Sequence, residues 1–287
     1  MSRTPFRFAE GTAVVTGAAG GMGEHVARLL AERGSDLVLA DRDGDRLETV
    51  ATAIRERHPG LSVTTETVDL ADRDAVDALA GRIRAGHPEV RLLVNNAGVA
   101  LGGDFARLTL DEFDWVMDVN FRAPVRLTHA LLPALTARPG AHVVNVSSLF
   151  GLIGPPGQSA YSSSKYALRG FSEVLRAELA QVGAGVTTVH PGGIRTNIAR
   201  SARVGVNIPA AEAEKGQRDF DKLLTFPADR AAELIVEAVA KRRPRLLIGA
   251  SARIPDALAR IAPAHGMTLL SRLLGASARR PATAGAR

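Results

Sequence analysis

Short apolar runs alternate with longer amphipathic stretches along most of the chain. Between the apolar runs, hydrophobic residues recur at helical spacing, as in Met22–Arg33, Arg46–Arg57 and Asp72–Arg84. Strand-length runs with little polar alternation are typical of a parallel sheet that is buried on both faces. The order therefore predicts an α/β fold, a doubly wound parallel sheet of about seven strands with helices on both faces. The expected strands are Thr12–Thr16, Asp36–Asp41, Ser62–Val68, Leu92–Asn95, His142–Ser147, Val186–His190 and Arg245–Ile248.

Two later segments interrupt this alternation. Asn197–Leu224 is polar and charged and follows Pro191-Gly192-Gly193, so we expect a mobile flap near the substrate. Residues 1–250 are then expected to form one catalytic domain that includes this flap, and residues 251–287 a C-terminal extension. The last 12 or so residues, rich in Ala, Arg and Pro, have a composition that predicts disorder.

Composition excludes several classes of protein. Of the 287 residues, 46% are hydrophobic, which is enough for a large core. The chain has no cysteine, which excludes disulfides, zinc–thiolate sites and a thiol nucleophile. No apolar run approaches the roughly 20 residues that span a bilayer, and the N-terminus lacks a secretory signal pattern. These features lead us to expect a cytoplasmic protein.

The excess of positive charge lies at the C-terminal end of the chain. The net charge is +6, but residues 241–287 hold ten Lys or Arg and one acid, so the remainder carries −3. A nucleic-acid partner is therefore not expected. Leucines at 269, 270, 273 and 274 beside Arg272 would allow peripheral contact with an anionic membrane. A helix docked on the domain is the interpretation that we favour.

A glycine-rich turn follows the first expected strand. Thr12–Thr16 leads into Gly17-x-x-x-Gly21-x-Gly23 and then into a helix. Glycines allow a tight turn and a close approach of the backbone to a ligand, and a helix N-terminus suits a pyrophosphate. The spacing differs from the common Gly-x-Gly-x-x-Gly fingerprint, and a tight turn without a ligand is the alternative.

Two neighbouring residues favour different cofactors. Asp41 ends the second expected strand, 18 residues after Gly23. A carboxylate there can bind both ribose hydroxyls of an adenosine and repel a 2′-phosphate, which favours NAD. Arg42 follows directly and favours NADP, because a guanidinium can bind that phosphate. We expect NAD ahead of NADP.

One of the two tyrosines has a lysine on the same helix face. Tyr161 is followed by Lys165, whereas Tyr166 has Gly170 at the same offset. A nearby ammonium lowers the pKa of a phenol from about 10 because it favours the phenolate. Tyr161 is thus a candidate general acid and base. Such pairs also occur by chance on helix surfaces.

Several motifs in order give this sequence its family resemblance. Over about residues 10 to 250, the chain resembles the short-chain dehydrogenase/reductase family, whose members have a Rossmann-like fold and bind NAD or NADP. The matching motifs are Thr16-Gly17-x-x-x-Gly21-x-Gly23, Asn95-Asn96-Ala97-Gly98, Asn120, Ser147-Ser148, Tyr161-x-x-x-Lys165 and Pro191-Gly192.

The resemblance implies four catalytic residues. Tyr161 would exchange a proton with the substrate oxygen, and Lys165 would lower its pKa and bind the nicotinamide ribose. Ser148, 13 residues before Tyr161, would hold the substrate oxygen, with Ser147 a structural neighbour. Asn120 would bend its helix and hold a water in a proton relay. No metal is expected.

The resemblance also implies the cofactor contacts. Asp69 would contact the adenine, and Ile194 and Thr196 the carboxamide, although Thr196 is also a candidate helix cap. The full expected set is Gly17, Gly21, Met22, Gly23, Asp41, Arg42, Asp69, Leu70, Asn96, Ala97, Gly98, Tyr161, Lys165, Pro191, Gly192, Ile194 and Thr196.

The expected substrate is an alcohol, with a hydrophobic secondary alcohol favoured, or the corresponding ketone or aldehyde. The loops near the site are mostly apolar or small, and Gln158 would bind a polar group of the substrate or cap the helix of Tyr161. The resemblance implies a homodimer or homotetramer. The alternative function is a non-catalytic regulatory protein that binds a dinucleotide. The expected substrate contacts are Ser148, Phe150, Gln158, Tyr161 and Gly193.

Overall fold

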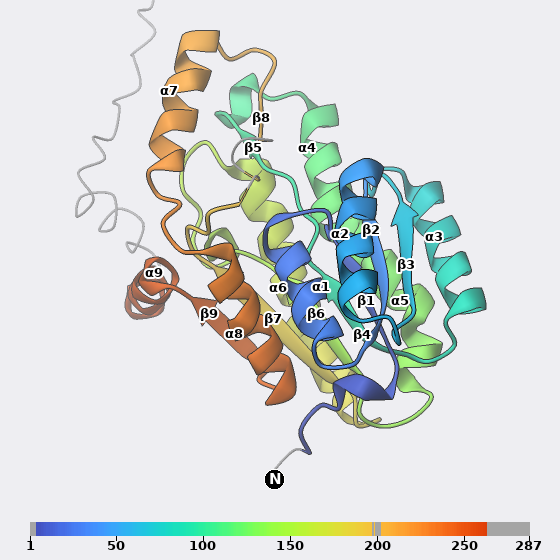
Figure 1. Cartoon of the computed structure of the whole chain (residues 1–287). Coiled ribbons are helices and arrows are strands. Elements are labelled where there is room, and N and C mark those ends of the chain that lie inside the picture. Colours follow the sequence, from blue (N-terminus) through green and yellow to red (C-terminus); the bar gives the residue numbers. More distant parts are fainter. Residues whose placement is uncertain (1–3, 197, 199–201, 263–287) are drawn as a thin grey trace, which may run out of the picture.

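A seven-stranded parallel sheet forms the centre of the molecule (Figure 1). The computed structural model describes residues 4–196, 198 and 202–262. The strand order is β3-β2-β1-β4-β6-β7-β9, so the direction of winding reverses between β1 and β4. The strands are β1 (Thr12–Thr16), β2 (Asp36–Asp41), β3 (Val63–Thr67), β4 (Val90–Asn95), β6 (His142–Val146), β7 (Gly185–Pro191) and β9 (Arg245–Ile248).

Helices cover both faces of this sheet, which confirms the predicted doubly wound architecture. Successive strand residues face opposite layers: Val14 packs in one cluster and Val15 in the other, and both are fully buried. The first layer contains α1 (Gly21–Ala31), α2 (Gly44–Arg57) and α8 (Ala228–Ala240). The second contains α3 (Arg73–Gly86), α5 (Ala123–Thr136) and α6 (Ser159–Ala180).

Aspartates fix the starts of two helices that follow strands. The Asp43 carboxylate accepts a hydrogen bond from the backbone N–H of Arg46, at 3.1 Å, and so caps α2. Asp72 accepts from Asp74 and Ala75 and caps α3. Such caps satisfy backbone donors that have no partner inside the helix.

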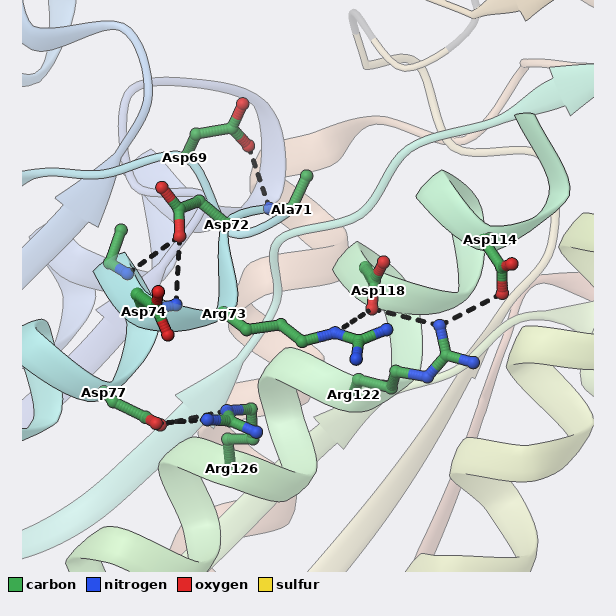
Figure 2. A network of polar contacts seen from close by, with 11 residues as sticks. Asp69, Ala71, Asp72, Arg73, Asp74, Asp77, Asp114, Asp118, Arg122 and Arg126 are labelled. Atoms are coloured by element: carbon green, nitrogen blue, oxygen red, sulfur yellow. Dashed lines mark hydrogen bonds and ion pairs between the residues drawn. The ribbon is translucent and has the colours of Figure 1, made fainter. Parts of the chain in front are cut away.

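A π-helical turn contains Asn120, the residue that the family resemblance expects to bend its helix. The structure has α4 (Leu110–Met117), a π-helical segment (Asp118–Arg122) and then α5. Asp118 accepts hydrogen bonds from Arg73 of α3 and from Arg122, each at 3.0 Å. Both contacts are drawn in Figure 2. These contacts anchor both ends of the turn that contains Asn120. A π turn inside a helix is frequently found at a functional site.

The expected flap is built from short elements above the sheet. β8 (Arg203–Val204) pairs with β5 (Leu101–Gly102), and α7 (Ala210–Asp221) follows. In Figure 1 these elements lie at the top, away from the N-terminus at the bottom. Arg107 donates to both carboxylate oxygens of Glu212, at 3.0 and 3.1 Å, which ties α7 to the segment before α4.

The first part of the expected C-terminal extension is a helix against the last strand. In α9 (Ala250–Ile261), Asp256 accepts from Arg245 of β9 and from Arg260. The expected disordered end and the leucines at 269–274 lie outside the described residues. Among the helices described, none is long and apolar enough to cross a membrane.

Candidate active site

A cleft of about 340 Å³ opens at the carboxyl ends of the central strands. It lies where the strand order reverses, the usual ligand position in such sheets. The expected cofactor residues that line it are Gly17, Gly21, Met22, Asp41, Arg42, Asp69, Leu70, Asn96, Ala97, Gly98 and Thr196. The lining residues that the sequence did not indicate are Ala19, Gly20, Asp43, Arg46, Val68, Val99, Trp115, Val119 and Ile198.

The glycine turn beside the cleft is closely packed and leaves no room for side chains at Gly17 and Gly23. A Cβ on Gly23 would lie 2.0 Å from the Gly17 oxygen, and one on Gly17 would lie 2.8 Å from the Cα of Ala97. Gly17 also has φ +69°, in the left-handed region that favours glycine. The Asn96 amide donates to the oxygens of Thr16 and Gly17 and holds this turn. The backbone that leads into α1 thus fits a dinucleotide pyrophosphate.

Charges of both signs lie at the other end of the cleft. Asp41 accepts from the backbone N–H groups of Ala19, at 3.0 Å, and Asp43, at 3.2 Å. Arg42 and Arg46 line the same end. A Cβ on Gly20 would lie 3.2 Å from Nη2 of Arg46, so this guanidinium lies over the glycine turn. A carboxylate and two guanidiniums therefore face the position expected for the adenosine ribose.

The side chains of Tyr161 and Ser148 interact with each other. The Ser148 hydroxyl also accepts from the backbone N–H of Phe150, at 3.1 Å, which orients it. The Phe150 ring packs edge-on against Tyr161, with ring centres 6.0 Å apart. Burial raises the pKa of Tyr161, and the hydrogen bond from Ser148 opposes that rise.

Lys165 is buried beneath Tyr161. Its Nζ lies 5.7 Å from the centre of the Tyr161 ring and donates to the oxygen of Val146, at 3.0 Å. Burial lowers the pKa of Lys165 to about 8, so most of it stays an ammonium at pH 7. Lys165 is not among the groups that shift the pKa of Tyr161, which is raised, so the lowering expected from the sequence stays a prediction. Ser147 donates to the backbone oxygen of Lys165, and its role here is structural.

Asn120 links the loop after β4 to α6, the helix that carries Tyr161, through hydrogen bonds of its side chain. Its Oδ1 accepts from Val99 N, at 2.8 Å, and its Nδ2 donates to the Val99 oxygen and to Ser164 Oγ. Ser164 in turn donates to the Tyr161 backbone oxygen, at 2.7 Å. Asn120 is fully buried, so its side chain fixes how these two segments lie relative to each other.

A buried histidine that the sequence did not indicate holds the backbone of Ser148. His190 on β7 is 1% exposed, and its Nδ1 lies 3.1 Å from the Ser148 carbonyl oxygen. Because a carbonyl only accepts, Nδ1 carries the proton in this contact. Burial is the main reason why the pKa of His190 falls to about 4, so the ring is neutral at pH 7.

Several expected contacts lie beside the cleft rather than on its wall. Gly23, Tyr161, Lys165, Pro191, Gly192 and Ile194 are absent from its lining. A Cβ on Gly193, an expected substrate contact, would lie 1.8 Å from the Leu223 oxygen, so this glycine packs against the chain before α8. Gln158 begins α6 but forms no side-chain cap, which leaves its amide available to a substrate. Thr196 accepts from Ile198 N at 3.4 Å.

Potential metal ligands do not cluster in the part of the chain that the structure describes: no three His, Asp or Glu side chains are grouped there. The polar groups that converge are hydroxyls, an amide and one ammonium. This set can exchange a proton with an oxygen and bind that oxygen by hydrogen bonds.

Comparison with known proteins adds independent information. The family model described as short chain dehydrogenase matches residues 11–206. The putative oxidoreductase SadH of Mycobacterium tuberculosis is 41% identical over 256 residues, which cover 87% of this chain and 90% of that protein.

Solved structures agree with this result. A short chain dehydrogenase/reductase from Burkholderia phymatum in complex with NAD has a TM-score of 0.81 and 28% identity, and covers 90% of this chain and 95% of that one. A short-chain dehydrogenase from Sphingobium yanoikuyae in complex with NADPH has a TM-score of 0.73 and 26% identity, and covers 96% and 98%.

Proposed function

This chain belongs to the short-chain dehydrogenase/reductase family of oxidoreductases, and we propose that it interconverts a hydrophobic secondary alcohol and its ketone. One observation carries the proposal: the side chains of Tyr161 and Ser148 interact with each other, and the buried ammonium of Lys165 lies 5.7 Å from the centre of the Tyr161 ring. A phenol, a hydroxyl and an ammonium in this arrangement suit proton exchange with an alcohol oxygen.

Tyr161, Ser148 and Lys165 have different roles at the substrate oxygen. When bound, a nicotinamide cofactor supplies the chemistry that accepts or returns a hydride. Tyr161 Oη removes the hydroxyl proton of the alcohol, or protonates the carbonyl oxygen in the reverse direction. Ser148 stabilises the oxygen while charge develops on it. Lys165 stabilises the phenolate and binds the nicotinamide ribose.

The cofactor that we propose is NAD in preference to NADP. The support is Asp41, whose carboxylate lies at the end of β2 and would repel a 2′-phosphate. Arg42 and Arg46 line the same part of the cleft and favour NADP. Complexes of similar proteins with NAD and with NADPH are both known.

The proposed substrate is apolar around its reacting carbon. Phe150 packs on Tyr161, and the neighbouring Leu152 and Ile153 are buried. An alcohol with small hydrophobic substituents fits such surroundings, and Gln158 would bind a polar group on it.

A turnover assay on the purified protein tests this function. Oxidation of NADH and NADPH is followed with a panel of hydrophobic ketones, and reduction of NAD with the matching alcohols. Turnover of a secondary alcohol or ketone by the wild type, lost in Ser148→Ala, supports the proposal. Tight cofactor binding without turnover of any member would instead favour a non-catalytic dinucleotide-binding protein.

We also propose that the protein is a homodimer or homotetramer. The helix α6 exposes Tyr166 and Val174, which are 41% and 59% exposed, and burial of such side chains favours association. Light scattering coupled to size-exclusion chromatography measures the mass directly, and a monomer at micromolar concentration would contradict this assembly.

A further inference from the structure

A second cavity, of about 430 Å³, lies at the amino ends of the strands. It is enclosed by the N-terminal segment, by the loop before β6 and by the turn before β7. The cofactor cleft is at the carboxyl ends, so the sheet separates the two. Figure 1 shows the N-terminus at the bottom of the molecule and β5, β8 and α7 at the top. The charged side chains that line the second cavity are Arg7, Glu10, Arg91 and Arg242.

Arg91 is a buried charge with no carboxylate partner among the residues that the structure describes. It is 9% exposed, and its Nη2 donates to the oxygen of Pro139, at 3.0 Å. Its Nε is buried and has no hydrogen-bond partner. Among residues 4–196, 198 and 202–262, no carboxylate lies within ion-pair distance of this guanidinium. Burial of an uncompensated charge is unfavourable, and a bound anion would offset that cost.

A second arginine holds the same loop from another direction. Arg242 is 7% exposed and donates to the backbone oxygens of Gly140, Ala141 and Gly183, at 2.8 to 3.0 Å. Arg91 meanwhile lies so near Gly140 that a Cβ there would be 2.6 Å from its Nη2. Two guanidiniums thus lie close together, and their mutual repulsion adds to the preference for an anion.

The remaining charges of the cavity are at its rim. Arg7 and Glu10 form an exposed ion pair, at 2.9 Å. Three arginines against one glutamate give the lining a net charge of +2. The uncharged walls include Pro5, Pro139 and Ala180, which are apolar.

We propose that this cavity binds a small organic anion, a carboxylate or phosphate ester with a compact apolar body. The head group would lie against Arg91, and the body against the proline and alanine walls. A cavity of about 430 Å³ is larger than a bare phosphate needs, which favours an organic anion. The site is independent of the proposed reaction, because it lies on the opposite edge of the sheet.

Titration with two probes tests the site. Inorganic phosphate and benzoate are each titrated into the full chain, with chloride at matched ionic strength as the reference, and followed by calorimetry and by the melting temperature. Arg91→Met keeps the length of the side chain and should weaken binding at least about tenfold, because charge-assisted hydrogen bonds are lost. Whichever probe binds more tightly identifies the class of head group.

Two rim variants and one control keep the test decisive if Arg91→Met fails to fold. Arg7→Gln should weaken binding a few-fold, and Glu10→Gln should strengthen it a few-fold, because each changes the rim charge in the opposite direction. Arg46→Gln, in the cofactor cleft, is the control for phosphate that binds at the α1 turn. Equal responses in wild type, Arg7→Gln and Glu10→Gln, or stabilisation no greater than with chloride, would overturn the proposal.

Discussion

At the residue scale, the preference for one cofactor depends on Asp41, which favours NAD, and on Arg42 and Arg46, which favour NADP. We expect Asp41→Asn to tighten NADPH binding about tenfold, or roughly 1.4 kcal/mol, because the repulsion of a 2′-phosphate is removed. The asparagine keeps an acceptor for the N–H of Ala19. Fluorescence titration with NADPH and NADH measures both constants.

The control for this variant is Arg46→Gln. It should weaken NADPH binding more than NADH binding, because the 2′-phosphate would add a contact to a guanidinium that also lies over the glycine turn. An Asp41→Asn protein with an unaltered ratio of the two constants would contradict the role given to Asp41.

His190 offers a test of how the catalytic serine is positioned. His190→Leu removes the donor to the Ser148 carbonyl, and we expect kcat to fall about tenfold with little change in the affinity for NADH. His190→Asn places an amide N–H near the position of Nδ1 and should restore most of the activity. Steady-state kinetics with the best ketone substrate measure both effects.

His142 provides the matched control. It is also fully buried, and its Nε2 lies 2.7 Å from Thr187 Oγ1, but it is at the amino end of β6. His142→Asn should lower stability without a specific loss of kcat. If His190→Leu and His142→Asn lower kcat equally, the effect of His190 is only structural.

The same histidine predicts how stability depends on pH. The pKa of His190 is about 4 in the folded protein and about 6.5 in the unfolded chain, so the unfolded chain binds the extra proton between these values. The contribution of neutral His190 to the stability of the folded protein is complete above pH 6.5. It is lost as the pH falls toward 4. Urea unfolding measures the free energy of unfolding at both pH values. Between pH 7 and pH 5 this free energy should fall by about 2 kcal/mol more in the wild type than in His190→Asn. An identical loss would show that His190 is not the group responsible.

At the scale of elements, the π-helical turn at Asp118–Arg122 depends on ion pairs that hold its ends. Asp118→Ala removes the acceptor for Arg73 and Arg122. We expect a loss of about 1 kcal/mol in stability and a several-fold lower kcat, because the turn that carries Asn120 loses its anchor. Urea unfolding and steady-state kinetics measure the two effects.

The matched control for Asp118→Ala is Asp77→Ala, at a second ion pair drawn in Figure 2. Asp77 of α3 pairs with Arg126 of α5, away from the π-helical turn. Asp77→Ala should lower stability to a similar extent and leave kcat unchanged. A parallel fall of kcat in both variants would mean that the turn needs no local anchor.

Helices and strands could be predicted from the sequence where their buried residues form a pattern within one stretch of the chain. The runs that became β1 and β2 are buried on both faces, so short apolar runs with little alternation marked them at the observed bounds. β5 and β8 have two residues each and pair across about a hundred positions, and so have no local pattern. The family resemblance predicted a bend at Asn120 but not its π form, because i to i+5 bonding leaves the side-chain pattern helical.

At the scale of the whole molecule, the sequence predicted the sheet and the residues around its central cleft better than the supporting contacts. Tyr161 and Lys165 are found from their spacing on one helix. Arg46 and His190 act through packing between distant segments, so nothing next to them in the chain marks them. The second cavity depends in the same way on three loops that meet only in the fold.

The central claim is that Tyr161 exchanges a proton with the substrate oxygen. The most direct measurement compares turnover and NADH binding in Tyr161→Phe and Tyr166→Phe, the only two tyrosines of the chain. We predict that Tyr161→Phe folds, binds NADH like the wild type and loses at least about 99% of kcat, because the proton donor is gone. Tyr166→Phe should keep its activity. Wild-type turnover in Tyr161→Phe would contradict the mechanism.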